Sequence, residues 1–345
     1  MGHDVACNKI SVHTLNKRAR EMLKLVNRCA ASGIPERATE QEIDSPETRS
    51  LLREIAVDSI VLLKNERQTL PLSRSDSVGY NKCSFSIYTI AKVNQIVIIG
   101  PNAKVTTFCG GGSSSLPPYY AISPYEGIQS KLKQDNIPFT VGAYSHNEIP
   151  LLGPQVSTKP VSGEPGVTLT VYNDPPSAVG RKSIDFKTFT KTDAMLMDYK
   201  VPQNTSGLWY ADIEGYFTPE MDGRYTLGLC VYGTAKLYVD GEMLIDNATR
   251  QRQGSAFFGC GTVEENGAIR VKRGQTYHIK VEFASAPTNT LGSGGLVRFG
   301  GGGFCIGEVF DMDPDEEIQC AVELAKGAKK VIVCVGLNVS LAYMT

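Results

Sequence analysis

The sequence predicts an α/β domain that is interrupted by an inserted all-β sandwich. Two observations indicate this fold class. Apolar, strand-like runs alternate with helical segments near both ends of the chain, and between about residues 166 and 304 apolar positions recur with a period of two. The chain of 345 residues is long enough for two domains of roughly 100–200 residues each.

Two helices are expected in the first 60 residues. The first spans residues 15–28, where apolar side chains share one face and Arg and Lys share the other. The second begins at Ser45-Pro46-Glu47, because Ser is a favourable N-cap and Pro fits the first helical position. The apolar face of the first helix contains Leu15, Ala19, Met22 and Val26, and the second is expected to carry Leu51, Leu52, Ile55 and Ala56 inward.

The α/β pattern appears on both sides of the middle block. Residues 95–100 form a continuous apolar run that ends in Gly and Pro, as in a strand covered on both faces of a parallel sheet. Helices are expected to start at Ser123-Pro124 and at Asp313-Pro314, and residues 331–336 form a second buried strand. Because helix and strand alternate at both ends, these flanks are predicted to belong to one α/β unit.

The middle block is predicted to be all-β. Residues 225–231 alternate Tyr, Leu, Leu and Val with Thr, Gly and Cys, and residues 277–283 repeat the pattern. Turns are expected at Asp222-Gly223, Asp240-Gly241 and Arg273-Gly274, and the two Asp-Gly pairs are hairpin signals. The sole tryptophan, Trp209, lies in a strand-like segment and is interpreted as core.

Composition excludes several classes of partner. A formal charge of -1 without a long Lys/Arg run predicts no affinity for nucleic acid. No stretch approaches the ~20 apolar residues of a membrane span. The polar N-terminus lacks the apolar run of a secretory signal, so the compartment stays open. Nine cysteines without a CxxC pair predict mostly free buried thiols, and the four histidines have no metal-site spacing.

Several segments, in order along the chain, resemble known families. The segments Glu54–Leu72, Ile98–Ala103, Gly110–Tyr120 and Ser123–Ile128 resemble the start of the second, α/β-sandwich domain of family 3 glycoside hydrolases. Within the all-β block, Leu208–Asp222, Gly223–Ile245 and Phe257–Glu265 are similar to a PA14 domain. A PA14 domain inserted at this point is typical of fungal-type β-glucosidases.

The resemblance implies four regions. Residues 1–45 correspond to a helix and linker that leave a TIM-like barrel absent from the sequence, and residues 46–159 to the first part of the α/β sandwich. Residues 160–309 correspond to the PA14 β-sandwich insert, and residues 310–345 to the resumed and truncated α/β sandwich. The implied fold is therefore an incomplete α/β sandwich domain interrupted by an all-β PA14 sandwich.

The resemblance also implies a reaction, the hydrolysis of terminal β-linked glucose with retention by two carboxylates, without a cofactor. In the family the nucleophilic Asp lies in the barrel, and the acid/base Glu follows a Gly-Leu-Asn segment within Trp-Glu-x-Glu-Gly. Here Gly336-Leu337-Asn338 is followed by Val339–Thr345 instead. No catalytic residue can therefore be assigned, and this chain by itself is predicted not to hydrolyse its expected substrate, a small β-glucoside or oligosaccharide.

Two segments depart from the family pattern. Val78–Lys92 stands where the family has a short connection, and Val339–Thr345 stands where the acid/base segment should follow. Both begin with Val and a small residue, which suggests the hypothesis of retained introns or an imperfect gene model. A lineage-specific loop at Val78–Lys92 is the alternative. The resemblance implies that the missing barrel is an intramolecular partner of this chain. The sequence does not decide whether the protein forms an oligomer.

Gly111, Gly112, Ser113 and Ser114 form the first candidate substrate-binding loop. Glycines permit close backbone approach, and free N–H groups or Ser hydroxyls could hold sugar hydroxyls. By resemblance this loop faces the barrel. The alternative is a loop whose glycines only turn the chain, whereas a phosphate loop is disfavoured because no Gly-Lys-Ser/Thr follows.

Phe257 and Phe258 are the second candidate for substrate binding, since an aromatic platform can hold the apolar face of a glucose ring. By resemblance, this sort of loop helps to form the aglycone subsite. The alternative is that both are sandwich core, and adjacent strand residues point to opposite faces, so at most one is expected to meet sugar.

A rival function is a non-catalytic carbohydrate-binding or adhesin-like module built on PA14. Such a calcium-binding lectin would need adjacent acidic residues in a loop and would lack the α/β flanks. Asp240-Gly241-Glu242 is better interpreted as a hairpin turn, so no calcium or other metal is expected.

Overall fold

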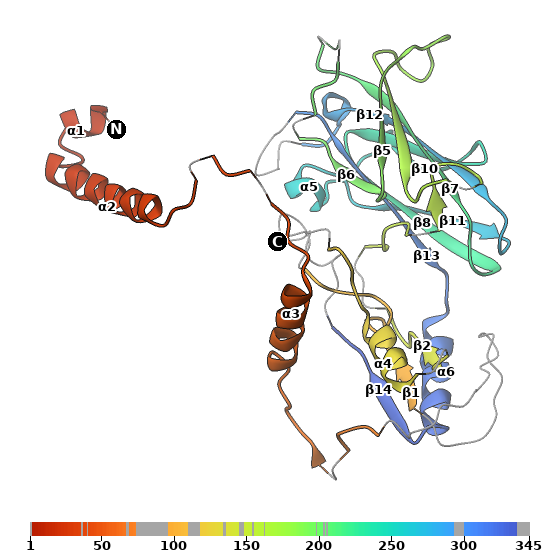
Figure 1. Cartoon of the computed structure of the whole chain (residues 1–345). Coiled ribbons are helices and arrows are strands. Elements are labelled where there is room, and N and C mark those ends of the chain that lie inside the picture. The colour runs from red at the N-terminus through yellow and green to blue at the C-terminus, as the bar shows by residue number, and fades with distance from the viewer. Residues whose placement is uncertain are drawn as a thin grey trace. The chain divides into compact units, whose positions relative to one another are not determined.

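The computed structural model describes residues 2–336 except 36, 40, 67–68, 74–95, 110–117, 134–135, 145–147, 154, 162, 198, 203, 205 and 293–299. The chain divides into two compact units, residues 1–70 and 71–345 (Figure 1). Val78–Lys92 and Val339–Thr345, the two segments that depart from the family pattern, lie outside the described residues.

The first unit contains three helices, α1 (Gly2–Ala6), α2 (Val12–Ala31) and α3 (Pro46–Asp58). The Ser11 hydroxyl caps α2 by accepting from the backbone N–H of Thr14 at 3.1 Å. The Ser45 hydroxyl caps α3 in the same way, and Pro46 occupies its first turn. The predicted start of the second helix is confirmed, and the first helix extends beyond the predicted residues 15–28 at both ends.

The apolar faces of α2 and α3 are exposed. No residue of α1, α2 or α3 is buried, and Leu51, Leu52 and Ile55 are each more than half exposed. The expectation that α3 carries these side chains inward is therefore wrong for this structure. The physical reason is that an amphipathic helix buries its stripe only against another element, and within this unit the described residues supply none.

The second unit contains a three-stranded parallel sheet with the order β14-β1-β2. The strands are β1 (Ile96–Ile99), β2 (Phe139–Thr140) and β14 (Lys330–Val333). Ile98 of β1 lies opposite Ile332 on one side and Phe139 on the other. Strands from the two flanks of the sequence therefore pair directly, as the α/β pattern predicts.

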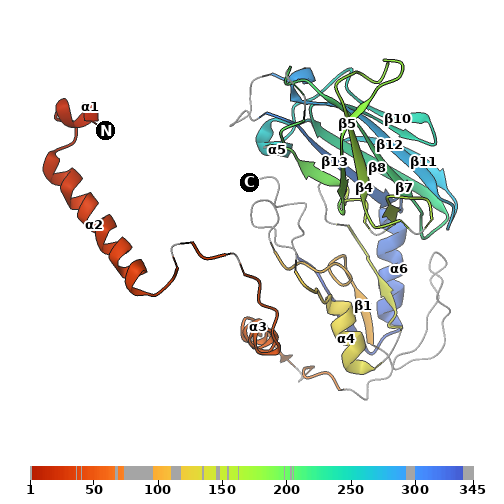
Figure 2. The same ribbon diagram turned by 45° about the horizontal axis from the view of Figure 1, so that its top comes forward.

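Two capped helices accompany this sheet, α4 (Pro124–Leu132) and α6 (Pro314–Lys326) (Figure 2). Ser123 and Glu126 form a capping box at α4, and the Asp313 carboxylate accepts two N–H groups at the start of α6. Both Ser-Pro and Asp-Pro starts are confirmed. The small core here is built on Ile98, Ala103 and Ile137, with side chains of α4 packed against it.

The strand β14 differs from its expected burial. Its sequence pattern predicts a strand covered on both faces, yet Val331 and Val333 are exposed. Among the described strands β14 pairs with β1 alone, so it lies at the edge of the described sheet, and no described element covers these two side chains. The central strand β1 is buried as predicted.

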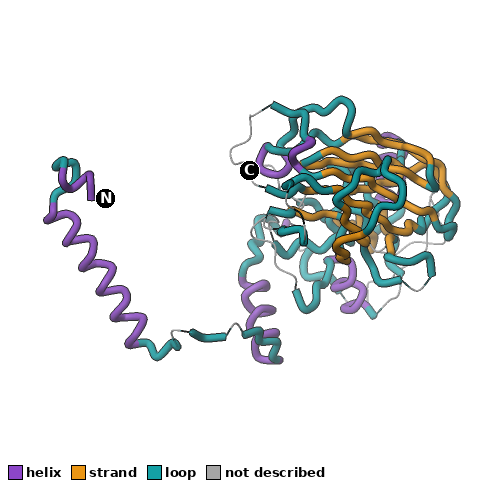
Figure 3. The backbone as a smooth tube through the Cα atoms, turned by 90° about the horizontal axis from the view of Figure 1, so that it is seen from above, coloured by secondary structure: helices purple, strands orange, loops and turns teal. Residues whose placement is uncertain are grey.

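The rest of the second unit is a sandwich of two antiparallel sheets (Figure 3). One sheet has seven strands in the order β10-β9-β12-β7-β4-β5, with β3 paired to β7, and the other has four in the order β11-β8-β13-β6. The strands of the first sheet are β3 (Val156–Ser157), β4 (Val167–Tyr172), β5 (Ser183–Phe189), β7 (Tyr210–Phe217), β9 (Thr234–Val239), β10 (Glu242–Asn247) and β12 (Tyr277–Ala284), and those of the second are β6 (Asp193–Met195), β8 (Gly223–Tyr232), β11 (Glu265–Val271) and β13 (Gly303–Phe310).

The main core lies between these two sheets and confirms the predicted period of two. Residues 225–231 of β8 and 277–283 of β12 turn their alternate apolar side chains into it. Trp209 is 2% exposed, packs against Tyr199 and Phe283, and is therefore core as predicted.

The predicted turns occur, but only one of the two Asp-Gly pairs closes a hairpin. Asp240 and Gly241 have φ of 49° and 87° and join β9 to its antiparallel partner β10. Asp222-Gly223 connects β7 to β8, and Arg273-Gly274 connects β11 to β12, so each crosses between the two sheets. The hairpin interpretation of Asp222-Gly223 is therefore wrong, because a local turn signal does not specify the strand that will be the partner.

Two further expectations concern membranes and thiols. None of the described helices is both long and apolar enough to pass through a bilayer. Of the described free cysteines only Cys230 and Cys260 are buried, while Cys7 and Cys29 are exposed on the helical unit, so the expectation of mostly buried thiols is wrong.

Candidate functional site

Phe257 and Phe258 lie in a tight turn, α5 (Ala256–Gly259), between β10 and β11. Both residues have left-handed backbone angles, with φ of 55° and 57°. Such a conformation costs roughly 1–2 kcal/mol for a residue with a Cβ atom. The turn is not a strand, so the alternation of faces expected from a strand does not apply here.

The turn directs the two rings differently. The Phe257 ring packs over two glycines, since a Cβ at Gly261 or at Gly303 would lie 2.6 or 2.7 Å from its ring carbons. Phe258 is 54% exposed. Phe257 therefore anchors the turn to β13, and Phe258 is the ring that remains accessible to a ligand.

Hydrogen bonds hold the turn in place. The Gly261 N–H donates to the Ala256 carbonyl at 2.9 Å, and the Gly254 N–H donates to the Gly261 carbonyl at 3.0 Å. The Asn289 side chain donates to the Cys260 carbonyl at 3.1 Å. Because Asn289 follows a short helix, η3 (Ala286–Thr288), the turn is tied to the end of the seven-stranded sheet.

The glycine-rich candidate Gly111, Gly112, Ser113 and Ser114 lies outside the described residues. The carboxyl ends of the parallel strands β1 and β14 are described. At Gly100, φ is 122° and a Cβ would lie 2.8 Å from the carbonyl carbon of Cys334, the residue after β14, so the backbone there passes too closely for a side chain. Asn102 lies beside Gly336, which brings the turns after β1 and β14 together.

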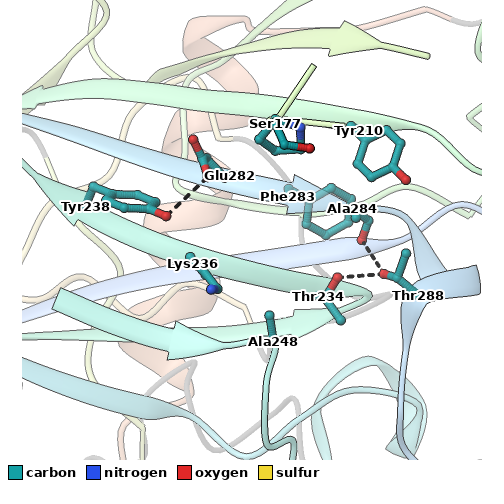
Figure 4. A pocket seen from close by; sticks show the side chains of 11 residues that line it. Ser177, Tyr210, Thr234, Lys236, Tyr238, Ala248, Glu282, Phe283, Ala284 and Thr288 are labelled. Atoms are coloured by element: carbon teal, nitrogen blue, oxygen red, sulfur yellow. Dashed lines mark hydrogen bonds between the residues drawn. The ribbon is translucent and has the colours of Figure 1, made fainter. Parts of the chain in front are cut away.

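A hollow of about 490 Å³ opens on the outer face of the seven-stranded sheet, opposite the core. Figure 4 shows Tyr238 and Tyr210 at opposite ends of it, with Glu282 and Lys236 between them. Small side chains form its floor and rim, among them Ala248, Ala284, Ser177, Thr234 and Thr288. This volume lies within the roughly 300–1,000 Å³ of small-ligand pockets.

Polar side chains around the hollow are held by one another. The Tyr238 hydroxyl donates to Glu282 at 3.2 Å, and Lys280 donates to the other Glu282 oxygen at 3.3 Å (Figure 4 shows the first bond). Lys280 also pairs with Asp212 at 3.3 Å, and Asp212 pairs with Arg181 at 2.7 Å. The outer face therefore carries a connected polar network.

Two glutamates at the other sheet have raised pKa values. Burial raises the pKa of Glu264 to about 7, although a hydrogen bond from the Ile149 N–H at 3.0 Å opposes this, and burial together with the Glu220 charge raises the pKa of Glu308 to about 7. The Glu264 side chain also occupies the space beside Gly228, where a Cβ atom would lie 2.6 Å from its carboxyl carbon. Neither carboxyl lines the hollow, and we assign neither a catalytic role.

The described residues contain no group of three or more His, Cys, Asp or Glu side chains that could hold a metal ion. Arg252, which precedes the Phe257–Phe258 turn, pairs with Glu265 at 2.9 Å and is largely exposed.

The chain matches one family model and several named proteins. A model of the PA14 domain matches residues 163–307. Over 338 residues, 98% of this chain, the sequence is 44% identical to a probable β-glucosidase I of Aspergillus clavatus, covering 38% of that protein. A probable β-glucosidase I of Aspergillus niger is 42% identical over 98% of this chain and 39% of its own length.

A solved structure agrees with these relatives. The β-glucosidase of Kluyveromyces marxianus in complex with glucose matches 99% of this chain and 38% of its own, with a TM-score of 0.75 and 34% identity. The chain belongs to this β-glucosidase family. It spans about 38% of the length of these β-glucosidases.

Sequence reasoning missed the hollow of this β-glucosidase-family chain. Tyr210, Tyr238 and Glu282 occupy the polar positions of strands whose period of two was recognised from the apolar positions alone. The sequence contained one indication of this hollow, namely that β7 and β9 each carry a tyrosine at an outward position. The sequence could not show that β12 lies between β7 and β9, which brings the two rings to one hollow.

Proposed function

We propose that the chain is the PA14-bearing part of a β-glucosidase that hydrolyses terminal, non-reducing β-glucosyl residues with retention. The observation that carries this proposal is 44% identity over 98% of the chain to a probable β-glucosidase I. The substrate class is a small β-glucoside or oligosaccharide, and the Kluyveromyces marxianus β-glucosidase in complex with glucose supports it. Both catalytic carboxylates would come from outside residues 1–345.

We further propose that the PA14 sandwich, residues 160–309, interrupts one α/β sandwich formed by residues 46–159 and 310–345. The parallel pairing of β1 with β14 supports this arrangement, because these strands lie before and after the whole β-sandwich in the sequence. Residues 1–45 would lead from the catalytic barrel into this domain.

The barrel would be the intramolecular partner of the helical unit. Four apolar side chains of α2 and α3 are each more than half exposed: Met22, Leu23, Leu51 and Leu52. A contiguous exposed apolar surface of this kind usually marks a binding interface. An apolar stripe of this kind favours a protein partner that covers it. We expect α2, which lies within residues 1–45, to pack on the barrel, whose sequence the relatives have in addition.

Phe258 is the proposed sugar-contacting residue of this part, together with Gly111, Gly112, Ser113 and Ser114. Its exposure and its rigid turn support a platform role, whereas Phe257 is occupied by packing on Gly261 and Gly303. In an active protein that contains both barrel and PA14 sequence, we expect Phe258→Ala to raise KM for cellobiose about tenfold with a smaller effect on kcat. Arg252→Ala should change neither, and an unchanged KM in Phe258→Ala would refute the platform role.

The activity itself is tested with p-nitrophenyl β-glucoside. We expect no turnover by the 345-residue chain, and turnover when the same chain is extended by the barrel and the Trp-Glu-x-Glu-Gly segment of a relative. Hydrolysis by the purified 345 residues would show that the catalytic carboxylates lie within them. An inactive extended protein that still binds saccharide would favour the non-catalytic PA14 module instead.

A further inference from the structure

We propose that the outer face of the seven-stranded sheet carries a second, non-catalytic binding site for a neutral saccharide. The site is the hollow between Tyr210 and Tyr238, and its floor is the outward side of β9 and β12. It is separate from the Phe258 turn, because neither Phe257 nor Phe258 lines it.

The arrangement of strands creates the hollow. Ala284 of β12 lies opposite Tyr210 of β7 on one side and Thr234 of β9 on the other. A small side chain therefore stands between a tyrosine and a threonine in adjacent strands, and the surface is depressed there. The Thr234 hydroxyl lies 2.7 Å from the Thr288 hydroxyl, which fixes the rim.

The charges around the hollow favour a neutral ligand. Three cations, Lys236, Lys280 and Arg181, face three anions, Asp246, Glu282 and Asp212, and each is paired within the group at 2.7 to 3.6 Å. Because these charges cancel locally, a charged ligand would gain little Coulomb energy and would lose its hydration. A neutral molecule with many hydroxyls loses less hydration energy than an ion does, and hydrogen bonds to the polar side chains can replace it.

Unused hydrogen-bonding capacity favours a polyhydroxylated molecule. A carboxylate offers about four acceptor positions, and among the described residues Glu282 accepts from Tyr238 and Lys280. The Lys236 ammonium has three donors, and in the described part of the chain its ionic partner is Asp246, at 3.6 Å. Within the described part of the chain no hydrogen bond involves the Tyr210 hydroxyl.

The two tyrosines supply the apolar contact that a sugar ring also requires. A pyranose presents a C–H face and a rim of hydroxyls, and tyrosine combines an apolar ring with a polar tip in the same way. Figure 4 shows the two rings at the ends of the hollow and the polar side chains between them. The site therefore fits a neutral glycoside better than an anion, a cation or a wholly apolar molecule.

The proposal is tested by titrating the isotope-labelled 345-residue chain with cellobiose and following backbone amide shifts. We expect saturable shifts in β7, β9 and β12 around the hollow. Tyr210→Ala should weaken binding at least about tenfold. Tyr210→Phe keeps the ring and should lose less affinity, and Glu282→Gln should weaken binding while the spectrum stays dispersed.

A matched control lies on the same strand. Tyr216 is an outward tyrosine of β7 that stacks on His278 and does not line the hollow, so Tyr216→Ala should leave cellobiose affinity unchanged. Absence of saturable shifts, shifts confined to the Phe258 turn, or equal losses in Tyr210→Ala and Tyr216→Ala would each overturn the proposal. Because no hydrolysis is measured, its failure is distinct from that of the proposed β-glucosidase activity.

The charge argument has its own test. Glucuronate and glucosamine should bind no more tightly than methyl β-glucoside, and cellobiose affinity should stay constant between about 0.05 and 0.5 M salt. Tighter binding of either charged sugar, or a strong salt dependence with cellobiose, would show that the hollow selects charge and would contradict the inference.

Discussion

At the scale of single residues, the position of Phe257 depends on two glycines. Its ring occupies the space above Gly261 and Gly303, and neither position has room for a Cβ atom. The turn pays for this anchorage with two left-handed phenylalanines, at roughly 1–2 kcal/mol each. The packing of Phe257 therefore fixes the turn from which Phe258 projects.

Gly303→Ala tests this anchorage. The added methyl would overlap the Phe257 ring, so we expect a loss of about 1–3 kcal/mol in the free energy of unfolding, measured by urea denaturation. Gly292→Ala, at a glycine with open space around it, should cost little. Gly303→Ala should destabilise the Phe257→Ala variant less than it destabilises the unchanged chain, because the ring it would overlap is gone. Equal losses in the free energy of unfolding in the two proteins would contradict the contact.

Glu308 gives a second test at this scale, through pH. Its folded pKa of about 7 lies above its usual value of 4.5, mainly because of burial. Its contribution to stability is therefore fully present below about pH 4.5 and is lost as pH rises through about 7. Gln stays neutral at every pH. We therefore expect the free energy of unfolding of Glu308→Gln, minus that of the unchanged chain, to be larger at pH 8 than at pH 5.

The measurement is urea unfolding of both proteins at the two pH values. Glu242→Gln, at an exposed glutamate of β10, serves as the control for the Glu-to-Gln change itself. A Glu308→Gln difference of the same size at pH 5 and pH 8 would show that this carboxyl does not titrate on folding as its burial indicates.

At the scale of elements, the outer face of β7 contains a buried ion pair. Asp212 pairs with Arg181, and both side chains are largely buried, while the second Asp212 oxygen and one Arg181 nitrogen have no hydrogen-bond partner among the described residues. Removing one partner leaves the other charged and poorly hydrated. We expect Asp212→Ala to cost about 3–5 kcal/mol in unfolding experiments.

Glu214→Ala is the matched control, because Glu214 lies two positions along the same face of β7 and is more exposed. It should cost at most about 1 kcal/mol. Replacing both partners, with Asp212→Leu and Arg181→Met together, should recover much of the loss. A cost for Asp212→Ala no larger than that for Glu214→Ala would contradict the assignment of a buried pair.

The strands could be predicted from the sequence more readily than their partners could. The alternation of apolar and polar residues correctly identified the strands at residues 225–231 and 277–283. Burial of one face of a strand requires an apolar side chain at every second position, so it can be recognised from the sequence alone. Asp222-Gly223 was misleading, since its turn joins two sheets. The exposure of β14 was also missed, because an edge strand and a central strand can have the same apolar sequence.

The candidate sites show the same limit. Phe258 could be proposed from two aromatic residues in a glycine-rich loop, but the left-handed backbone that separates it from Phe257 was not foreseeable from residue types. The hollow requires Ala284, Thr234 and Tyr210 to be adjacent, and they come from three strands. Long-range pairing is the information that a single sequence does not provide.

At the scale of the whole molecule, the two units should differ in local stability. The sandwich has a continuous core, whereas no residue of α1, α2 or α3 is buried. Helices without tertiary packing are marginal in water. By hydrogen–deuterium exchange, we expect the amides of β7, β8 and β12 to stay protected for hours and those of α2 and α3 to exchange within minutes.

Comparable protection of α2 and the sandwich strands would show that the helical unit is covered in solution. Peptides from the exposed strand β14 provide an internal comparison, because β14 has one strand partner, β1, within the described residues. We expect their protection to fall between that of the sandwich and that of the helices.

The pairing of β1 with β14 has a consequence for the order in which the protein is made. The two strands lie roughly 230 residues apart, so β1 leaves the ribosome long before its partner exists. During that interval the sandwich strands between them are synthesised and have mostly nearby partners, so they can assemble first. Their assembly shortens the effective loop that separates β1 from β14 and lowers the entropy cost of closing it. A mutation that slows folding of the sandwich would therefore leave the apolar β1 strand exposed in the nascent chain for longer, and its harm would appear as aggregation during synthesis.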